Sequence, residues 1–146
     1  MRLFTIGFTQ KTAQEFFDLL KFYQVQRLVD IRLRPQGQLA GFAKQEDLPY
    51  FLENLASQCR YIHLPILAPT KDILEEFRES RNWSIYELKF ERLMDERNVP
   101  SILNRDDFET QTSCLLCSEP TPEKCHRRLV AERLGSRWTN VEIIHL

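Results

Sequence analysis

The sequence of 146 residues has little glycine, no long apolar run and almost no net charge. Its 4 glycines form no repeat, which excludes collagen-like chains and glycine-rich linkers, and neither a Walker loop nor a GxGxxG fingerprint occurs. No apolar run approaches the about 20 residues that cross a bilayer. The 20 basic and 21 acidic side chains give a formal net charge of -1, so the whole chain offers nucleic acid no attractive field. Affinity for phosphate must therefore come from a local cluster.

The N-terminal segment also lacks the features of an export signal. MRLFTIGF has one arginine before an apolar stretch that is too short for a signal peptide. We therefore expect a soluble, cytoplasmic protein without membrane association. Because that compartment is reducing, free thiols are expected at all 4 cysteines, which are Cys59, Cys114, Cys117 and Cys125.

Short β-prone runs alternate with helical patterns along the chain. Strands are expected at residues 3–6, 28–31, 61–64, 112–117 and 141–145. Helices are expected at residues 13–23, 48–55, 71–79, 84–93 and 122–134. Residues 33–45 form a long loop, and residues 98–111 a loop with at most one helical turn. This alternation predicts a single α/β domain over residues 1–146, with a mostly parallel sheet and flanking helices.

Capping residues indicate where several of these helices begin and end. Thr12 with Glu15, and Ser84 with Glu87, have the spacing of capping boxes. The last helix is expected to have Thr121 as its cap, Pro122 at its first position and Gly135 just beyond its end.

Polar residues follow the first two strands, at the edge where parallel sheets bind ligands. Gly7 and Thr9 follow the first strand, and Asp30, Arg32 and Arg34 lie at the end of the second. In an extended segment the last three point to one side, so two guanidinium groups could clamp a phosphate or carboxylate. The alternative is that Asp30 only pairs with an arginine and fixes the long loop.

The segment LLCSEPTPEKCHRRL contains the densest cluster of reactive side chains. A helix that begins at Pro122 would place free N–H groups and the positive end of its dipole beside Cys125 and His126. That end would bind an anion and lower the pKa of Cys125, so we expect Cys125 to be more acidic than Cys117. The alternative is that both thiols are buried and pack as small hydrophobic groups.

Several more specific sites are disfavoured. Cys114 and Cys117 have an odd separation, which sends their side chains to opposite faces of a strand and argues against a zinc or redox pair. A phosphatase-like or rhodanese-like loop needs backbone donors that Pro120 and Pro122 remove. A zinc site has suitable ligand types but no regular spacing in the set His63, Cys117, Cys125 and His126.

The long loop at residues 33–45 carries an aromatic ring and a cation close together. Phe42 and Lys44 are the pair that stacking on a nucleobase would use. The alternative is that the loop only anchors itself on the core through Phe42. A loop of this length is often a lid or a binding loop.

The segments TIGFT, LVDIRLRP, GFAK, YIHLP, LLCSEPTPEKCHRRLVAERL and VEIIHL resemble, in this order, the family named domain of unknown function 488. The resemblance covers nearly the whole chain and implies a small prokaryotic α/β domain with its shared residues at one edge. These are Thr5, Gly7, Asp30, Arg32, Pro35, Phe42, Lys44, Tyr61, Cys117, Glu119, Cys125, His126 and Arg127. The family has no established activity, so the resemblance implies a fold and a site but no reaction.

Two short segments depart from the pattern of that family. Phe8-Thr9 stands where the family usually has His-Ser, which argues against a catalytic role for position 8. Leu67-Ala68-Pro69 stands where a Leu-Gly-Gly loop is usual, which suggests a stiffer rim.

These features predict an anion-binding pocket at the carboxyl edge of the sheet, for a phosphate-bearing small molecule such as a nucleotide or for a nucleic-acid end. If the protein is a hydrolase or transferase, its catalytic residues are expected to be Asp30, Glu119, Cys125 and His126. The expected ligand-binding residues are Gly7, Thr9, Arg32, Arg34, Phe42, Lys44, Cys117 and Arg127. The alternatives are a non-catalytic ligand-sensing or protein-interaction module, and a thiol-based redox or metal site. We expect no metal, no cofactor, and a monomer or homodimer.

Overall fold

The expected strands pair into one parallel sheet in the computed structural model, which describes the whole chain except the side chain of Gln38. The five described strands are β1 (Arg2–Gly7), β2 (Arg27–Asp30), β3 (Arg60–His63), β4 (Ser113–Cys117) and β5 (Glu142–His145). Their order is β3-β2-β4-β1-β5, and each neighbouring pair is parallel. The predicted α/β class is confirmed, and each strand begins and ends within one residue of its expected position.

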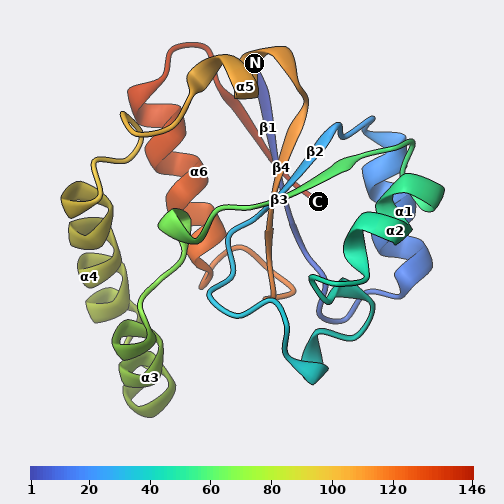
Figure 1. Ribbon diagram of the computed structural model, residues 1–146. Helices are drawn as coiled ribbons and strands as arrows, with labels where there is room; N and C mark the ends of the chain where they lie inside the picture. The colour runs from blue at the N-terminus through green and yellow to red at the C-terminus, as the bar shows by residue number, and fades with distance from the viewer.

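Helices cover both faces of the sheet (Figure 1). On one face lie α1 (Ala13–Phe22) and α2 (Leu48–Leu55), and on the other lie α3 (Lys71–Ser80), α4 (Trp83–Glu96) and α6 (His126–Arg137). The short helix α5 (Arg105–Thr110) occupies part of the segment expected to be a loop, because Asn104 caps it by accepting from the N–H of Asp106. Among the described residues, no helix has the length and hydropathy needed to cross a membrane.

Successive side chains of a strand point to opposite faces of the sheet and so belong to two different apolar cores. Cys114 and Leu116 of β4 belong to the core under α1 and α2, whereas Leu115 belongs to the core under α4 and α6. Cys117 continues this alternation and contacts His126 of α6, so Cys114 and Cys117 lie on opposite faces, as their odd spacing predicts.

Two helix starts illustrate how capping decides a boundary. The capping box of Thr12 and Glu15 is present at α1, with both reciprocal hydrogen bonds formed. The start expected at Ser84 is wrong, because α4 begins at Trp83 and its cap is Asn82, whose side-chain oxygen accepts from the N–H of Ile85.

The expected limits of the last helix are also wrong. Helix α6 begins at His126 and Cys125 is its N-cap residue, because residues 122–125 form a turn in which the N–H of Cys125 donates to the carbonyl of Pro122 at 3.2 Å. Gly135 lies within the helix instead of ending it. A Cβ at Gly135 would be 3.1 Å from Ile143 Cδ1, so this glycine allows the close approach of β5.

The long loop between β2 and α2 contains short helical turns. A 3-10 helix covers Gln38–Ala43 with a kink at Gly41, whose φ of 54° is in the region that favours glycine. A second 3-10 turn, Pro65–Leu67, follows β3 and leads toward α3.

Gly7 allows the loop after β4 to cross the end of β1. Its register partner is Cys117, and a Cβ at position 7 would lie 1.7 Å from the carbonyl oxygen of Glu119 and 2.9 Å from Arg127 Nη1. Contact with a backbone oxygen cannot be relieved by rotating a side chain, so only glycine fits here.

We expect Gly7→Ala to lower the free energy of unfolding by about 2–3 kcal/mol, because the loop after β4 must move away. Gly37→Ala is the matched control, since a Cβ at Gly37 meets nothing within 4 Å and its φ of -61° suits alanine. Its effect should be below about 0.5 kcal/mol. Urea denaturation of the two variants measures the difference, and equal stabilities would contradict the close approach at Gly7.

Candidate functional site

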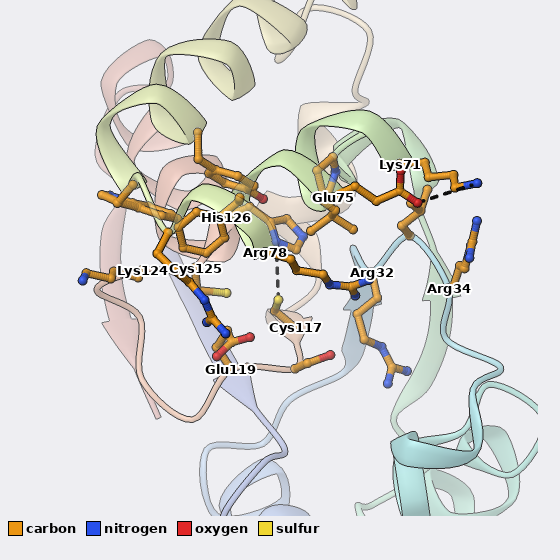
Figure 2. Close-up of a pocket in the computed structure, with 18 residues that line it drawn as sticks. Arg32, Arg34, Lys71, Glu75, Arg78, Cys117, Glu119, Lys124, Cys125 and His126 are labelled. Carbon is orange, nitrogen blue, oxygen red and sulfur yellow. Dashed lines mark hydrogen bonds and ion pairs between the residues drawn. The ribbon is translucent and has the colours of Figure 1, made fainter.

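A cavity of about 620 Å³ opens at the carboxyl edge of the sheet (Figure 2). The floor comes from the end of β4 and the start of α6, through Cys117, Cys125 and His126. The segment after β2, helix α3 and the first turns of α4 complete the wall. The pocket therefore lies where a parallel sheet is expected to bind its ligand.

Cationic side chains predominate around this cavity. Among the described residues that line it, two are acidic, Glu75 and Glu119, and six are cationic, Arg32, Arg34, Lys71, Arg78, Arg81 and Lys124. Figure 2 shows Arg34 and Lys71 on one side of the cavity and Lys124 on the other. All the cations except Arg32 are exposed, and Lys71 approaches Glu75 at 3.7 Å. A chain of net charge -1 thus concentrates positive charge at one edge.

A cysteine and a histidine meet on the cavity floor. Cys117 Sγ lies 3.4 Å from His126 Nδ1, and the other ring nitrogen, Nε2, lies 2.7 Å from the carbonyl oxygen of Ile31. A carbonyl can only accept, so Nε2 carries a proton and Nδ1 is the nitrogen that exchanges a proton with the thiol. Both side chains are buried, and the Ile31 carbonyl fixes the orientation of the ring.

The two groups shift each other's pKa. Burial disfavours the Cys117 thiolate, but hydrogen bonds from Cys125 and His126 and the charges of His126 and Arg127 outweigh it, so the pKa of Cys117 lies well below its ordinary value. Burial also opposes the His126 cation, yet the thiolate and the Ile31 carbonyl raise the pKa of His126. The pair therefore favours a thiolate beside an imidazolium.

The expectation that Cys125 is the more acidic thiol is wrong. Burial, followed by the hydrogen bond with Cys117 and the negative charge of that neighbour, raises the pKa of Cys125 well above its ordinary value. The expected acidity of Cys125 depended on a helix that begins at Pro122 and contains Cys125. Since α6 begins at His126, the histidine lies in its first turn and contacts Cys117 directly.

Arg127 organises the loop above this pair. Its side chain is fully buried, and Nη1 donates to the carbonyl of Glu119 at 2.6 Å and to Cys125 Sγ at 3.5 Å. Nη2 lies 3.5 Å from the carbonyl of Pro120. These contacts use Nη1 and Nη2, whereas the buried Nε has no hydrogen-bond partner among the described residues. Arg127 is not part of the described cavity lining.

Asp30, Arg32 and the half-buried Tyr61 form a second polar cluster, which shares Arg32 with the cavity lining. Arg32 donates from Nε and Nη2 to the two oxygens of Asp30 at 2.9 and 2.7 Å, and Tyr61 donates to Asp30 Oδ2 at 2.6 Å. Burial, with the hydrogen bond to Asp30 and the charge of Asp30, raises the pKa of Tyr61, so the phenol stays protonated. Arg32 Nη2 also donates to the carbonyl of Ala43 at 2.7 Å, so the pair does fix the long loop, as the alternative for Asp30 proposed.

The structure thus divides the expected site residues into two groups. The cavity is lined by Arg32, Arg34, Cys117, Glu119, Cys125 and His126. Its described lining does not include Gly7, Thr9, Asp30, Phe42, Lys44 or Arg127. Phe42 packs on Phe16 and Phe17 at ring distances of 5.3 and 5.8 Å, so it anchors the loop on the core. Thr9 holds the loop after β4 through a backbone bond of 3.1 Å to Ser118.

Sequence reasoning missed the contribution of α3 and α4. Lys71, Arg78 and Arg81 reach the cavity from α3 and the residue just after it. Trp83 and Tyr86 of α4 add an aromatic wall, with rings stacked at 4.9 Å and 19°. The only signal was a stretch of mixed charge, residues 71–81, followed by two aromatic residues, and such a pattern is equally typical of an exposed helix face.

The three residues of the cavity floor are also a group that could hold a metal ion. The donor atoms of Cys117, Cys125 and His126 all lie within 4.8 Å of one another. A structural zinc site uses four protein ligands. His63, the fourth residue considered from the sequence, instead has Nε2 at 2.9 Å from the carbonyl of Arg32. That the protein binds no metal remains a prediction.

One family model matches most of this chain. The family described as Domain of unknown function DUF488 matches residues 12–134, which include the cavity floor and most of the sheet. The chain belongs to this family. The comparisons of this chain with the curated proteins and with the solved structures found no match. Membership in DUF488 confirms the resemblance found in the sequence and assigns no reaction.

Replacing Asp30 tests the structural role of the buried pair. We expect Asp30→Asn to lower the free energy of unfolding by about 3–5 kcal/mol, because it leaves the Arg32 charge buried without its carboxylate. Glu109→Gln, which removes the exposed partner of Arg105, is the control and should cost less than about 1 kcal/mol. Urea denaturation compares the two, and a small effect of Asp30→Asn would show that the pair does not hold the loop.

The pH dependence of alkylation tests the Cys117–His126 pair. The thiolate reacts, so iodoacetamide should label Cys117 with an inflection below the about 8.5 of an ordinary thiol. His126→Asn should raise that inflection and slow labelling at pH 7 about tenfold for each unit of pKa. His63→Asn is the control, because the ring of His63 contacts the carbonyl of Arg32, and this variant should leave the pH profile of Cys117 labelling unchanged. Faster labelling of Cys125 than of Cys117 would contradict the pairing.

Proposed function

We propose that this DUF488 protein is a hydrolase or transferase that acts on a phosphate-bearing substrate, a nucleotide or a nucleic-acid end, with Cys117 as nucleophile. The observation that carries the proposal is the contact of 3.4 Å between Cys117 Sγ and His126 Nδ1 on the floor of a cation-lined cavity. A thiolate beside an imidazolium is the usual form of an activated cysteine nucleophile.

The wall of the cavity supports a phosphate as ligand. Within the described part of the chain, the ion pairs leave four lining cations without a carboxylate partner, Arg34, Arg78, Arg81 and Lys124. Guanidinium groups bind phosphate oxygens bidentately, and lysine adds a point charge. The half-buried ring of Trp83 also lines the cavity, where it stacks on Tyr86 and has Arg128 Cζ 5.9 Å from its centre.

The proposed reaction has two steps in which His126 moves the proton. The Cys117 thiolate forms a bond to phosphorus, the bond from phosphorus to the leaving oxygen breaks, and that oxygen takes the proton of His126 Nδ1. Water, or an acceptor hydroxyl in a transferase, then attacks phosphorus and gives its proton to His126. The phosphorus–sulfur bond breaks and restores the thiolate. Glu119, exposed at the rim, is the second acid/base candidate.

Other residues expected at the site have supporting roles in this proposal. Asp30 is a positioning residue, because both its oxygens are bound by Arg32 and Tyr61 and it lies outside the described cavity lining. Arg127 is also a positioning residue, since it holds the carbonyl of Glu119 and the sulfur of Cys125.

A ligand-sensing module without catalysis is the second candidate. It is favoured by the burial of Cys117, which is 4% exposed, so that a substrate must reach the cavity floor for attack to occur. Such a protein would bind the same phosphate-bearing ligands and would release no product.

Ligand binding and turnover separate the two candidates. We expect ATP, inorganic phosphate or a 5′-phosphorylated oligonucleotide to raise the Tm of the protein, and Arg78→Ala to reduce the shift. Arg92→Ala, at an exposed arginine outside the described cavity lining, is the matched control and should keep the shift. With ATP or the 5′-phosphorylated oligonucleotide as substrate, Cys117→Ser should lower phosphate release about 1000-fold or more.

Each result has a defined meaning. A Tm shift that depends on Arg78, with no product released, supports the sensing module and contradicts the enzyme. If none of the three probes shifts the Tm, the phosphate pocket itself is contradicted.

A further inference from the structure

The proposed reaction leaves one reactive group on the cavity floor unused. Cys125 lines the same cavity as Cys117, and its sulfur lies within 4.8 Å of both Cys117 Sγ and the donor atom of His126. Both thiols are free and buried, with 2% of Cys125 and 4% of Cys117 exposed. Two thiols so close, one beside an imidazole, form an arrangement suited to disulfide chemistry.

We propose that Cys117 and Cys125 are a reversible modification site, at which a small hydroperoxide that enters the cavity converts the two thiols into an intramolecular disulfide. The consequence for activity rests on the proposed function, because the disulfide would consume the nucleophile. The disulfide itself does not depend on it and would form equally in a non-catalytic protein.

The chemistry balances with a hydroperoxide as the two-electron oxidant. The Cys117 thiolate attacks one peroxide oxygen, a sulfur–oxygen bond forms and the oxygen–oxygen bond breaks. The departing oxygen takes a proton from His126 and leaves as an alcohol, or as water if the oxidant is hydrogen peroxide. The Cys125 sulfur then attacks the sulfenic sulfur of Cys117. The sulfur–sulfur bond forms, the sulfur–oxygen bond breaks, and the oxygen leaves as water with the proton of Cys125.

The surroundings of Cys125 favour this second step. Cys125 is the N-cap residue of α6 with an extended backbone, φ -137° and ψ 136°, so its side chain is outside the helical turn. Closing from within 4.8 Å to the about 2.05 Å of a disulfide requires movement of two adjacent side chains. Residues 118–124 form a loop between the two cysteines, and no helix or strand has to break.

The charge of Cys117 also determines the order of the two steps, oxidation of Cys117 and attack by Cys125. The thiolate of Cys117 is one cause of the raised pKa of Cys125, and a neutral sulfenic acid removes that repulsion. Arg127 Nη1 remains 3.5 Å from Cys125 Sγ and favours the thiolate. Cys125 should therefore become nucleophilic only after Cys117 has been oxidised.

The other two cysteines serve as internal references. Cys114 is buried on the opposite face of β4, and burial raises its pKa well above the ordinary value. Burial raises the pKa of Cys59 to about 12. Neither should react with peroxide in the folded protein, because the thiolate is the reactive form.

Peptide mass spectrometry without reductant tests the proposal. The protein is dialysed against a chelator, treated with one equivalent of hydrogen peroxide, alkylated and digested with trypsin. Cleavage after Arg105, Lys124 and Arg127 places Cys114 and Cys117 in the peptide of residues 106–124, and Cys125 in that of residues 125–127. We expect these two peptides to be linked, and the link to disappear on treatment with dithiothreitol.

Variants identify the cysteine that forms the link. Cys114→Ala should keep it and Cys117→Ala should abolish it. In Cys125→Ala, Cys117 should instead accumulate as a sulfenic acid that dimedone traps. If Cys125→Ala fails to fold, the digests of the wild type and of Cys114→Ala still show whether Cys117 and Cys125 are linked. A link through Cys114 or Cys59, oxidation of Cys117 beyond the sulfenic acid without any link, or no oxidation of Cys117 would each overturn the proposal.

The activity assay distinguishes this proposal from the proposed function. If phosphate release is present, it should fall in proportion to the linked fraction and return after reduction. A link in a protein that releases no phosphate would leave the modification site standing and count against the enzyme. Phosphate release that continues undiminished in fully linked protein would show that Cys117 is not the nucleophile.

Discussion

The ring of His126 joins three segments that are far apart in the sequence. Its Nε2 donates to the carbonyl of Ile31, where the chain leaves β2, and its Nδ1 contacts Cys117 at the end of β4. The ring itself belongs to the first residue of α6. Since both nitrogens are engaged inside the protein, the ring can neither rotate nor exchange partners without loss of a buried hydrogen bond. The position of the cavity floor depends on this side chain, and the lowered pKa of Cys117 depends on it together with Cys125 and Arg127.

Two polar clusters with different hydrogen-bond partners lie at the carboxyl edge of the sheet, and Arg32 of the first also lines the cavity. Asp30, Arg32 and Tyr61 satisfy one another and bind Ala43, which ties the long loop to β2. Cys117 and His126 form their pair at the start of α6, and burial there leaves the thiol with few partners. A carboxylate with both oxygens bonded is suited to holding a loop, whereas a thiolate stabilised by a neighbouring imidazolium, a thiol and a guanidinium charge is suited to reacting.

Local concentration of charge reconciles a nearly neutral chain with a cation-lined cavity. Helix α3 and the residues just after it bring Lys71, Arg78 and Arg81 to the cavity, and Lys124 arrives from the loop before α6. Helix α3 also carries acidic side chains, but only Glu75 of these lines the cavity, and other acidic residues form ion pairs away from it, such as Arg105–Glu109 and Arg128–Glu132. Net charge therefore says little about a site whose field falls off within about 10 Å.

The sequence by itself determined the alternation of strands and helices, the parallel sheet and the family, because apolar period, capping residues and motifs are local properties. It also placed Cys117, His126 and Glu119 at the correct edge, since strand ends in a parallel sheet face one way. Only the tertiary structure decided which thiol is acidic, because that depends on where α6 begins and on the Ile31 carbonyl that orients His126. The cations of α3 could not be assigned either, because the direction in which a helix face points is set by packing against distant residues.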